Sequence, residues 1–164
     1  MNEIVTTYHL EMNSVTELNE KTDSKGLSVL EAELDEYRFN RYLYEYIGSP
    51  WEWTDKLSQS DSEWAEYVEN PNLRTWVAYL KGSIAGYFEL LANGDGTTEI
   101  AYFGLAESFI GKGFGGYFLS QAIKNAWSID STKRVYVHTC TLDHESALMN
   151  YKARGFKVYR TETT

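Results

Sequence analysis

Glycines at alternate positions mark the stretch of this sequence best suited to binding chemistry. Gly111, Gly113 and Gly115 lie in the run Gly-Lys-Gly-Phe-Gly-Gly, between a predicted strand and a predicted long helix. A backbone without side chains at the start of a helix exposes its N–H groups, and the helix dipole favours negative charge there. The run therefore predicts a binding site for an anionic group.

Two common nucleotide-binding motifs do not account for this run. A Walker A loop requires Ser or Thr after Gly-Lys, whereas Gly113 follows Lys112. The spacing does satisfy Gly-x-Gly-x-x-Gly, but a dinucleotide fold also needs a βαβ unit and an acidic residue about 20 positions on. Asp130 lies near that distance, yet it closes the predicted helix instead of ending the next strand. We therefore exclude a dinucleotide-binding fold.

Composition and charge limit the class of protein. The chain has 164 residues, 43% of them hydrophobic, which predicts one domain over residues 1–164. The single cysteine, Cys140, excludes an internal disulfide and is typical of a reducing compartment. Residues 1–4 lack the start of a signal peptide and no segment is long and apolar enough to span a bilayer, so we expect a cytoplasmic protein without a membrane partner.

The net charge of −9 is unevenly distributed. Residues 1–70 hold sixteen acidic and five basic side chains, and residues 71–164 hold eight acidic and ten basic ones. Nucleic-acid binding needs a basic face, which the sequence lacks. The acidic half either serves solubility or attracts a cation.

Hydrophobic spacing and turn signals predict the elements around the glycine run. Strands are expected at 4–12, 27–34 (where a helix start is the alternative), 74–80, 83–92, 97–105, 133–141 and 156–160. Four helices are expected to end at Gly48, Asn70, Ile129 and Gly155, the second beginning with a capping box of Ser60 and Glu63. The first carries an apolar face of Phe39, Tyr42, Leu43, Tyr46 and Ile47. The order indicates an α/β (α+β) fold, with a mixed, mostly antiparallel central sheet and helices on both faces.

Two motifs at this separation resemble the GNAT superfamily of acetyl-CoA-dependent N-acetyltransferases. The segment from Phe109 to Gly115 is similar to the family's acyl-CoA loop, Gln/Arg-x-x-Gly-x-Gly/Ala. Downstream, Ala147-x-x-x-Tyr151-x-x-x-Gly155-Phe156 resembles the family's Asn-x-x-Ala-x-x-x-Tyr-x-x-x-Gly-Phe, and the order of elements fits along nearly all of the chain. Two positions depart from the pattern: Ile110 stands in place of Gln or Arg, and His144 in place of Asn.

The resemblance implies that acetyl-CoA is the co-substrate. Backbone atoms of Phe103, Gly104 and Leu105 would pair with the pantetheine arm like an added strand. The glycine loop would hold the pyrophosphate through residues Ile110, Gly111, Lys112, Gly113, Phe114, Gly115 and Gly116. Because Ile110 replaces Gln or Arg, one pyrophosphate contact must come from the backbone alone or from Lys112. His144 either contacts the cofactor or hydrogen-bonds the end of the preceding strand.

Acetyl transfer also needs a neutral amine, a polarised thioester carbonyl and a proton for the departing thiolate. The resemblance implies that Tyr151 is the general acid; the alternative is a core aromatic. Glu99 and His138 are both candidates for the general base, and the residues alone do not decide between them. Cys140 is expected to be a small buried hydrophobe, because the resemblance implies direct transfer. No metal site is expected.

We therefore expect an N-acetyltransferase that moves an acetyl group directly from acetyl-CoA to a primary amine, as a monomer or homodimer. The acceptor is expected to be a small cationic or aromatic amine, held by Tyr42, Tyr46, Trp51, Trp53, Tyr87 and Glu89. Three alternatives remain: a non-catalytic acyl-CoA-binding sensor or interaction module, a transferase for longer acyl groups, and a protein or peptide N-acetyltransferase.

Overall fold

Seven strands form one sheet in the order β2-β3-β4-β5-β6-β1-β7 in the computed structural model, which describes residues 4–164. The strands are β1 (Thr6–Met12), β2 (Ser28–Glu31), β3 (Leu73–Leu80), β4 (Ser83–Ala92), β5 (Thr97–Leu105), β6 (Arg134–Cys140) and β7 (Lys157–Thr163). Every neighbouring pair is antiparallel except β5 and β6. The predicted mostly antiparallel sheet is confirmed.

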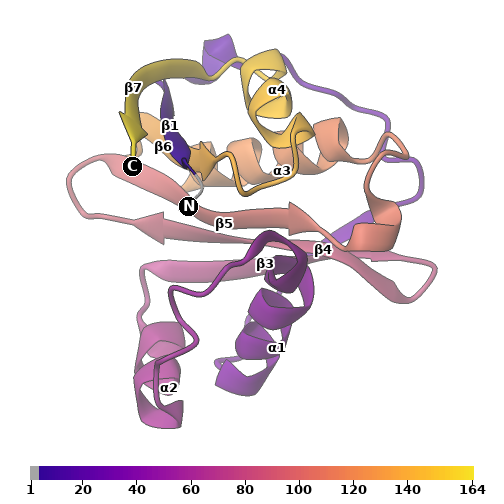
Figure 1. Cartoon of the computed structure of the whole chain (residues 1–164), viewed down its shortest axis with the longest axis vertical. Helices are drawn as coiled ribbons and strands as arrows, with labels where there is room; N and C mark the ends of the chain where they lie inside the picture. The colour runs from indigo at the N-terminus through magenta and orange to yellow at the C-terminus, as the bar shows by residue number, and fades with distance from the viewer. Residues whose placement is uncertain (1–3) are drawn as a thin grey trace.

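The helices cover both faces of this sheet, as expected (Figure 1). The helices α1 (Tyr37–Gly48) and α2 (Asp61–Glu69) lie on one face, and α3 (Gly115–Ser128) and α4 (Ser146–Ala153) lie on the other. Short 3-10 turns occur at Val15–Glu17, Ser49–Trp51 and Glu107–Phe109. Within residues 4–164, no helix has both the length and the apolar character needed to cross a membrane.

Each face of the sheet has its own core. The predicted stripe of α3 is buried against β1, β4, β5 and β6, through Leu119, Ala122, Ile123 and Ala126. On the other face, Leu43, Tyr44 and Ile47 of α1 pack with Trp64 of α2. Both faces of the sheet are therefore covered by packed helices.

The predicted apolar face of α1 is wrong in part. Tyr42 and Tyr46 are 51% and 40% exposed and stack on each other with ring centroids 5.5 Å apart. The helix instead turns Asn40 toward the sheet, where its amide donates to Thr75 Oγ1 and Glu89 Oε2, both at 3.1 Å. The buried side of α1 therefore carries Asn40, Leu43, Tyr44 and Ile47, which follow the spacing i, i+3, i+4 and i+7. This series begins one residue later in the sequence than the predicted one, which began at Phe39.

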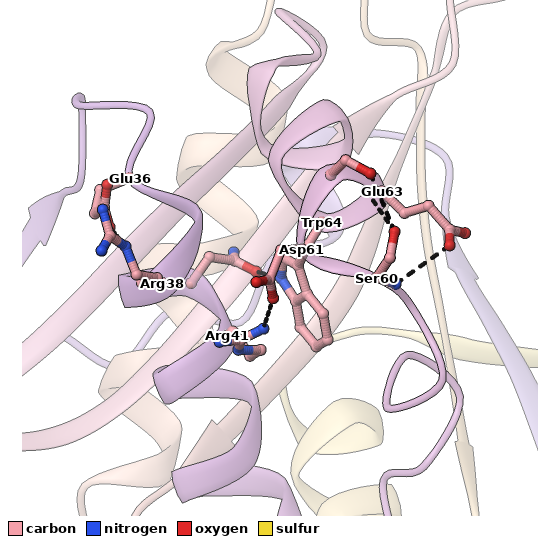
Figure 2. A network of polar contacts seen from close by, with 9 residues as sticks. Glu36, Arg38, Arg41, Ser60, Asp61, Glu63 and Trp64 are labelled. Carbon is pink, nitrogen blue, oxygen red and sulfur yellow. Dashed lines mark hydrogen bonds and ion pairs between the residues drawn. The ribbon is translucent and has the colours of Figure 1, made fainter.

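The predicted capping box at the start of α2 is confirmed (Figure 2). Ser60 Oγ accepts from the Glu63 N–H at 3.2 Å, and Glu63 Oε1 accepts from the Ser60 N–H at 3.2 Å. In the next position Asp61 binds Arg41 of α1 at 2.6 Å, and α2 thereby stays beside α1. The cap fixes the point where the chain leaves the loop at 52–60, whose residues line the site described below.

We expect Ser60→Ala to lower the free energy of unfolding by about 1 kcal/mol. The Glu63 N–H loses its acceptor, and the return hydrogen bond from the backbone N–H at position 60 to the Glu63 carboxylate is weakened. Urea unfolding followed by circular dichroism measures the loss. Ser58→Ala is the matched control, an exposed serine in the same loop. An equal loss in both variants would contradict a specific role for the cap.

Candidate functional site

The parallel strands β5 and β6 pair over only three residues. Thr97, Thr98 and Glu99 face Arg134, Val135 and Tyr136, after which β5 continues to Leu105 and β6 to Cys140. The other edge of β5 remains bonded to β4 throughout this stretch. In the part of the chain that the structure describes, the edge of β5 beyond Glu99 that faces β6 therefore has no strand partner, and its backbone groups are available to a ligand.

A bulge in β5 lies where the strands separate. Tyr102 faces Glu89 and Ile100 faces Leu90, so Ala101 is the extra residue. Such bulges bend a strand and redirect its side chains and backbone groups. Ala101 accordingly lines one of the cavities between the two strands.

Two cavities meet in the opening and share Trp51, Trp53, Phe103, Asp143 and Tyr151 as lining. The first, of about 270 Å³, extends toward the glycine run and is also lined by Gly104, Leu105, Ile110, Gly111, Gly113, Gly115, Thr139, His144, Ser146, Ala147 and Asn150. The second, of about 230 Å³, extends toward the loop after α1 and is also lined by Glu52, Thr54, Asp55, Ile100, Ala101, Tyr102, Val137, His138, Cys140 and Leu142. Two molecules that enter from opposite sides would meet at the shared residues.

Trp53 forms part of the wall between the cavities, where it is hydrogen-bonded to Asp143 and lies against Gly48 and Gly104. Its Nε1 donates to Asp143 Oδ1 at 3.1 Å. A side chain on Gly104 would collide with Ile47 Cγ2 at 2.6 Å and contact Trp53 Cη2 at 3.4 Å, and a side chain on Gly48 would overlap the indole. The two glycines therefore make room for the ring, and Asp143 fixes its orientation.

Asp143 in turn is fixed by the end of β6. Its Oδ2 accepts from Thr139 Oγ1 at 2.7 Å and from the Cys140 N–H at 3.2 Å. The sequence did not single out Asp143, because its role depends on Trp53, which lies 90 residues away in the chain. Burial raises the pKa of the Cys140 thiol, so this half-buried cysteine holds its proton and is a poor nucleophile.

The Tyr151 hydroxyl belongs to a side chain that is 5% exposed and lines both cavities. The ring packs against Phe103 and Phe156, with centroids 6.1 and 5.9 Å away. Burial, and to a lesser degree the negative charge of Asp143, raise the pKa of Tyr151 well above its usual value. The hydroxyl therefore stays protonated and is able to donate a proton.

Glu99 and His138 lie side by side where the strands separate. Their Oε2 and Nδ1 atoms are 3.8 Å apart, and their side chains are 20% and 50% exposed. Burial raises the pKa of Glu99, and the nearby His138 partly offsets this effect. Only His138 of the two lines the second cavity. The pair is able to accept a proton at the mouth of that cavity.

The glycine run has the geometry of an anion site. Gly111 and Gly113 have φ values of +78° and +87°, which other residues adopt only with strain. No hydrogen bond within residues 4–164 uses the N–H groups of Gly111, Lys112 or Gly113. The start of α3 has no side-chain cap and no acidic residue in its first turn. These groups are therefore free for a negatively charged ligand.

His144 lies just before α4, which begins at Ser146 and not near Asp143 as the spacing predicted. Its Nδ1 accepts from the Ser146 N–H at 3.0 Å, and its ring meets Trp51 edge-on at 5.4 Å. The imidazole thus satisfies the start of the following helix, and it also lines the first cavity. From α4, Asn150 Nδ2 donates to the Gly115 carbonyl at 3.0 Å, which ties α4 to the glycine run.

Several predicted residues do not line either cavity. Tyr42 and Tyr46 lie on the exposed side of α1. Tyr87 and Glu89 are fully buried between the sheet and the helices α1 and α2. In the glycine run, Lys112 is exposed outside the cavity, Phe114 is buried against Phe109, and Gly116 lies next to Lys21 and Arg154. The structure brings together Phe103, Gly104, Leu105, Ile110, Gly111, Gly113, Gly115, His138, His144, Tyr151, Trp51 and Trp53.

Glu89 belongs to a buried cluster that anchors the loop at 52–60. Its oxygens accept from Tyr67 and Tyr87 hydroxyls at 2.5 and 3.0 Å, and Lys56 Nζ lies 3.7 Å away. The Lys56 ammonium is enclosed by the aromatic rings of Tyr44, Trp64, Tyr67 and Tyr102, at 3.6 to 5.3 Å from their centroids. Burial lowers the pKa of Lys56 to about 8, although Glu89 favours its charged form. The loop that carries Trp53 is therefore attached to the sheet through this lysine.

The second cavity has an acidic lining. Glu52, Asp55 and Asp143 contribute carboxylates to it, and its lining contains no lysine or arginine. Within residues 4–164, no group of three or more His, Cys, Asp or Glu is arranged to hold a metal ion.

Residues 29–156 match the family model described as the acetyltransferase (GNAT) family, and no curated protein matches the sequence. Among solved structures, a GCN5-related N-acetyltransferase from Sphaerobacter thermophilus has a TM-score of 0.72 at 13% identity, over 99% of this chain and 51% of that chain. Another, from Kribbella flavida, has a TM-score of 0.69 at 16% identity, over 95% and 55%.

A third similar structure is a spermidine N-acetyltransferase from Vibrio cholerae in complex with CoA and spermine. Its TM-score is 0.63 at 19% identity, and the match covers 81% of this chain and 82% of that chain. The chain spans about half the length of the Sphaerobacter and Kribbella proteins. At these identities the likeness establishes the fold.

The lowered pKa of Lys56 predicts how stability changes above neutral pH. Because this pKa is about 8 in the folded protein and about 10.4 in an unfolded chain, the unfolded chain binds more protons between these values. The contribution of Lys56 to the free energy of unfolding therefore rises with pH across this window, by at most about 1.4 kcal/mol per pH unit, while the raised pKa of Cys140 acts in the opposite direction. Urea unfolding between about pH 8 and about pH 9.5 measures the rise, below the range where tyrosines ionise.

Lys56→Met should remove this rise, whereas Lys124→Met, which alters an exposed lysine, should leave it intact. The titratable groups that face Lys56 are Glu89, Tyr44, Tyr67 and Tyr102. The pKa values of the three tyrosines are raised, so they make the free energy of unfolding fall with pH, but only above about pH 10. The same pH dependence in wild type and Lys56→Met would contradict the assignment.

Proposed function

Because the chain belongs to the acetyltransferase (GNAT) family, we propose that it transfers an acetyl group from acetyl-CoA directly to a primary amine of a small molecule. The observation that carries the proposal is the position of Tyr151 at the junction of two cavities, beside an unpaired strand edge. We treat residues 1–164 as one catalytic domain, which the pairing of β1 with β7 supports.

In this proposal the first cavity receives acetyl-CoA, which supplies the acetyl group as a thioester. The free edge of β5 at Phe103, Gly104 and Leu105 offers backbone donors and acceptors to an amide-containing arm. The cavity then leads to the unused N–H groups of the glycine run and the start of α3, which favour a pyrophosphate. The bulge at Ala101 leaves backbone N–H groups near the junction, where they would polarise the thioester carbonyl.

Tyr151 is the general acid in this proposal. Its raised pKa keeps the hydroxyl protonated, so the proton is present when the thiolate departs beside it. Its location against Phe103, the first residue of the proposed binding edge, supports this role. The burial that raises the pKa also excludes water, which would otherwise compete with the amine.

His138 is the general base, and Glu99 is its partner. His138 lines the second cavity, where the amine would enter, and an imidazole takes up a proton near neutral pH. Glu99, 3.8 Å away, would stabilise the imidazolium that forms when the ammonium loses its proton. Glu99 itself does not line the cavity, so we assign it a positioning and electrostatic role.

The acceptor is a cationic amine. The carboxylates of Glu52, Asp55 and Asp143 give the second cavity a negative potential, and its lining contains no lysine or arginine to offset it. Trp51 and Trp53 add ring faces that stabilise an ammonium group. The similar Vibrio cholerae protein was solved with spermine, a cationic amine, which supports this class of acceptor.

A thiol-release assay with acetyl-CoA tests the proposal. The panel contains monoamines, diamines, polyamines and peptides with free amino termini, and we expect the highest kcat/KM for a diamine or polyamine. The isoleucine at position 110 favours one rival, a protein that binds acyl-CoA and transfers nothing. Acetyl-CoA binding without turnover on any amine or peptide would support that rival and contradict the proposal.

We expect Tyr151→Phe to lower kcat by about 10²- to 10⁴-fold, since the thiolate would leave without a proton donor. The dissociation constant for CoA, measured by calorimetry, should stay within about 2-fold because the ring remains. Tyr159→Phe, at an exposed tyrosine of β7, is the matched control. Unchanged turnover in Tyr151→Phe would exclude it as the acid.

The activities of two single variants distinguish the members of the base pair. His138→Gln should lower kcat/KM by about 10²- to 10⁴-fold, because the group that takes up the proton is lost. Glu99→Gln should retain most of the activity, because it removes only a carboxylate 3.8 Å from the imidazole. If Glu99→Gln abolished turnover while His138→Gln preserved it, Glu99 would be the base.

A further inference from the structure

Arg154 is a buried cation without a hydrogen-bond partner among residues 4–164. It follows α4, is 5% exposed, and its Nε and Nη1 atoms are buried with no hydrogen-bond acceptor. Burial lowers its pKa, and no carboxylate in residues 4–164 raises it again. A guanidinium in this state destabilises a protein unless an anion binds to it.

The guanidinium lies at the start of α3. Its Nη1 is 2.8 Å from the point that a Cβ atom on Gly116, the second residue of α3, would occupy. A Cβ atom there would force the guanidinium to shift, so Arg154 lies directly against the first turn of α3. Arg154 therefore adds positive charge to a helix start that already lacks a cap and an acidic residue.

Two lysines from the loop between β1 and β2 reach the same place. Lys21 Cδ is 2.7 Å from the same point above Gly116, and the Lys25 ammonium contacts the position where Gly113 would carry a side chain. The carboxylates of this loop make other contacts: Glu17 with the Asn13 N–H, Glu20 with Lys124, and Asp23 with the Lys25 N–H. Three cations therefore converge on one helix start, and none of them is paired with a carboxylate in the part of the chain that the structure describes.

We propose that Arg154, together with Lys21 and Lys25, binds a phosphate group of coenzyme A and supplies the positive charge that Ile110 lacks. The inference rests on the proposed function, because it places the phosphate end of acetyl-CoA at the glycine run. A guanidinium suits this task, since its parallel N–H groups match two phosphate oxygens. The exposed lysines act as mobile charges that close over the ligand.

Calorimetric titration of CoA into wild type and Arg154→Met tests the proposal. Methionine keeps most of the buried volume and removes the charge, so we expect binding about 10- to 100-fold weaker. Because the lost cation was unpaired, the ligand-free variant should melt at the same or a higher temperature than wild type. Lys152→Met, which removes an exposed charge from the same helix, should bind CoA as wild type does.

Dephospho-CoA identifies which phosphate is bound. An equal loss for CoA and dephospho-CoA in Arg154→Met assigns the pyrophosphate, and a loss for CoA alone assigns the 3′-phosphate; both support the proposal. The double variant Lys21→Met/Lys25→Met changes exposed side chains only, so it folds, and we expect weaker CoA binding with a smaller salt dependence.

CoA binding within about 2-fold of wild type in both Arg154→Met and the lysine double variant would overturn the proposal. The failure of the proposed function has a different signature, which is a wild-type protein that does not bind CoA at all. In that case thermal stabilisation by inorganic pyrophosphate decides: stabilisation of wild type but not of Arg154→Met supports the anion site, and equal responses overturn it.

Discussion

The separation of β5 from β6 after Glu99 and Tyr136 is the constraint on which the rest of the site depends. A parallel pair that stops after three residues leaves one edge of a central strand without partners, although both faces of the sheet are covered by helices. The backbone groups along this edge are able to pair with an amide-containing ligand as they would with an added strand. The bulge at Ala101, the two cavities and the position of Tyr151 all follow from this separation.

Two buried cations show how differently the chain treats positive charge. Lys56 is enclosed by aromatic rings beside Glu89, and it attaches the loop that carries Trp53. Arg154 has no such compensation and lies at a helix start that favours anions. Glu89 offsets part of the desolvation cost of Lys56 in the ligand-free fold, whereas Arg154 would have its cost offset only when an anion binds. This contrast is the physical basis for assigning one cation to structure and the other to binding.

Much of the fold followed from local patterns, because alternation, helical spacing and turn residues act over short distances. The hairpins at β3–β5 and the capping box of Ser60 and Glu63 are examples. The face of α1 was wrong because aromatic residues occupy both of its sides, and only the buried contact of Asn40 selects one. Asp143, Lys56 and Arg154 lay outside prediction for a related reason: each acquires its role from residues brought near by tertiary packing.

Amide hydrogen exchange measured by NMR, with and without acetyl-CoA, tests the central claim most directly. If the free edge of β5 receives the pantetheine arm and the glycine run its pyrophosphate, the amides of Phe103–Leu105 and of residues 111–116 should exchange more slowly on binding. The amides of β2 and β7, at the outer edges of the sheet, should exchange as before. Protection at those edges, with no change along β5 and the glycine run, would contradict the account.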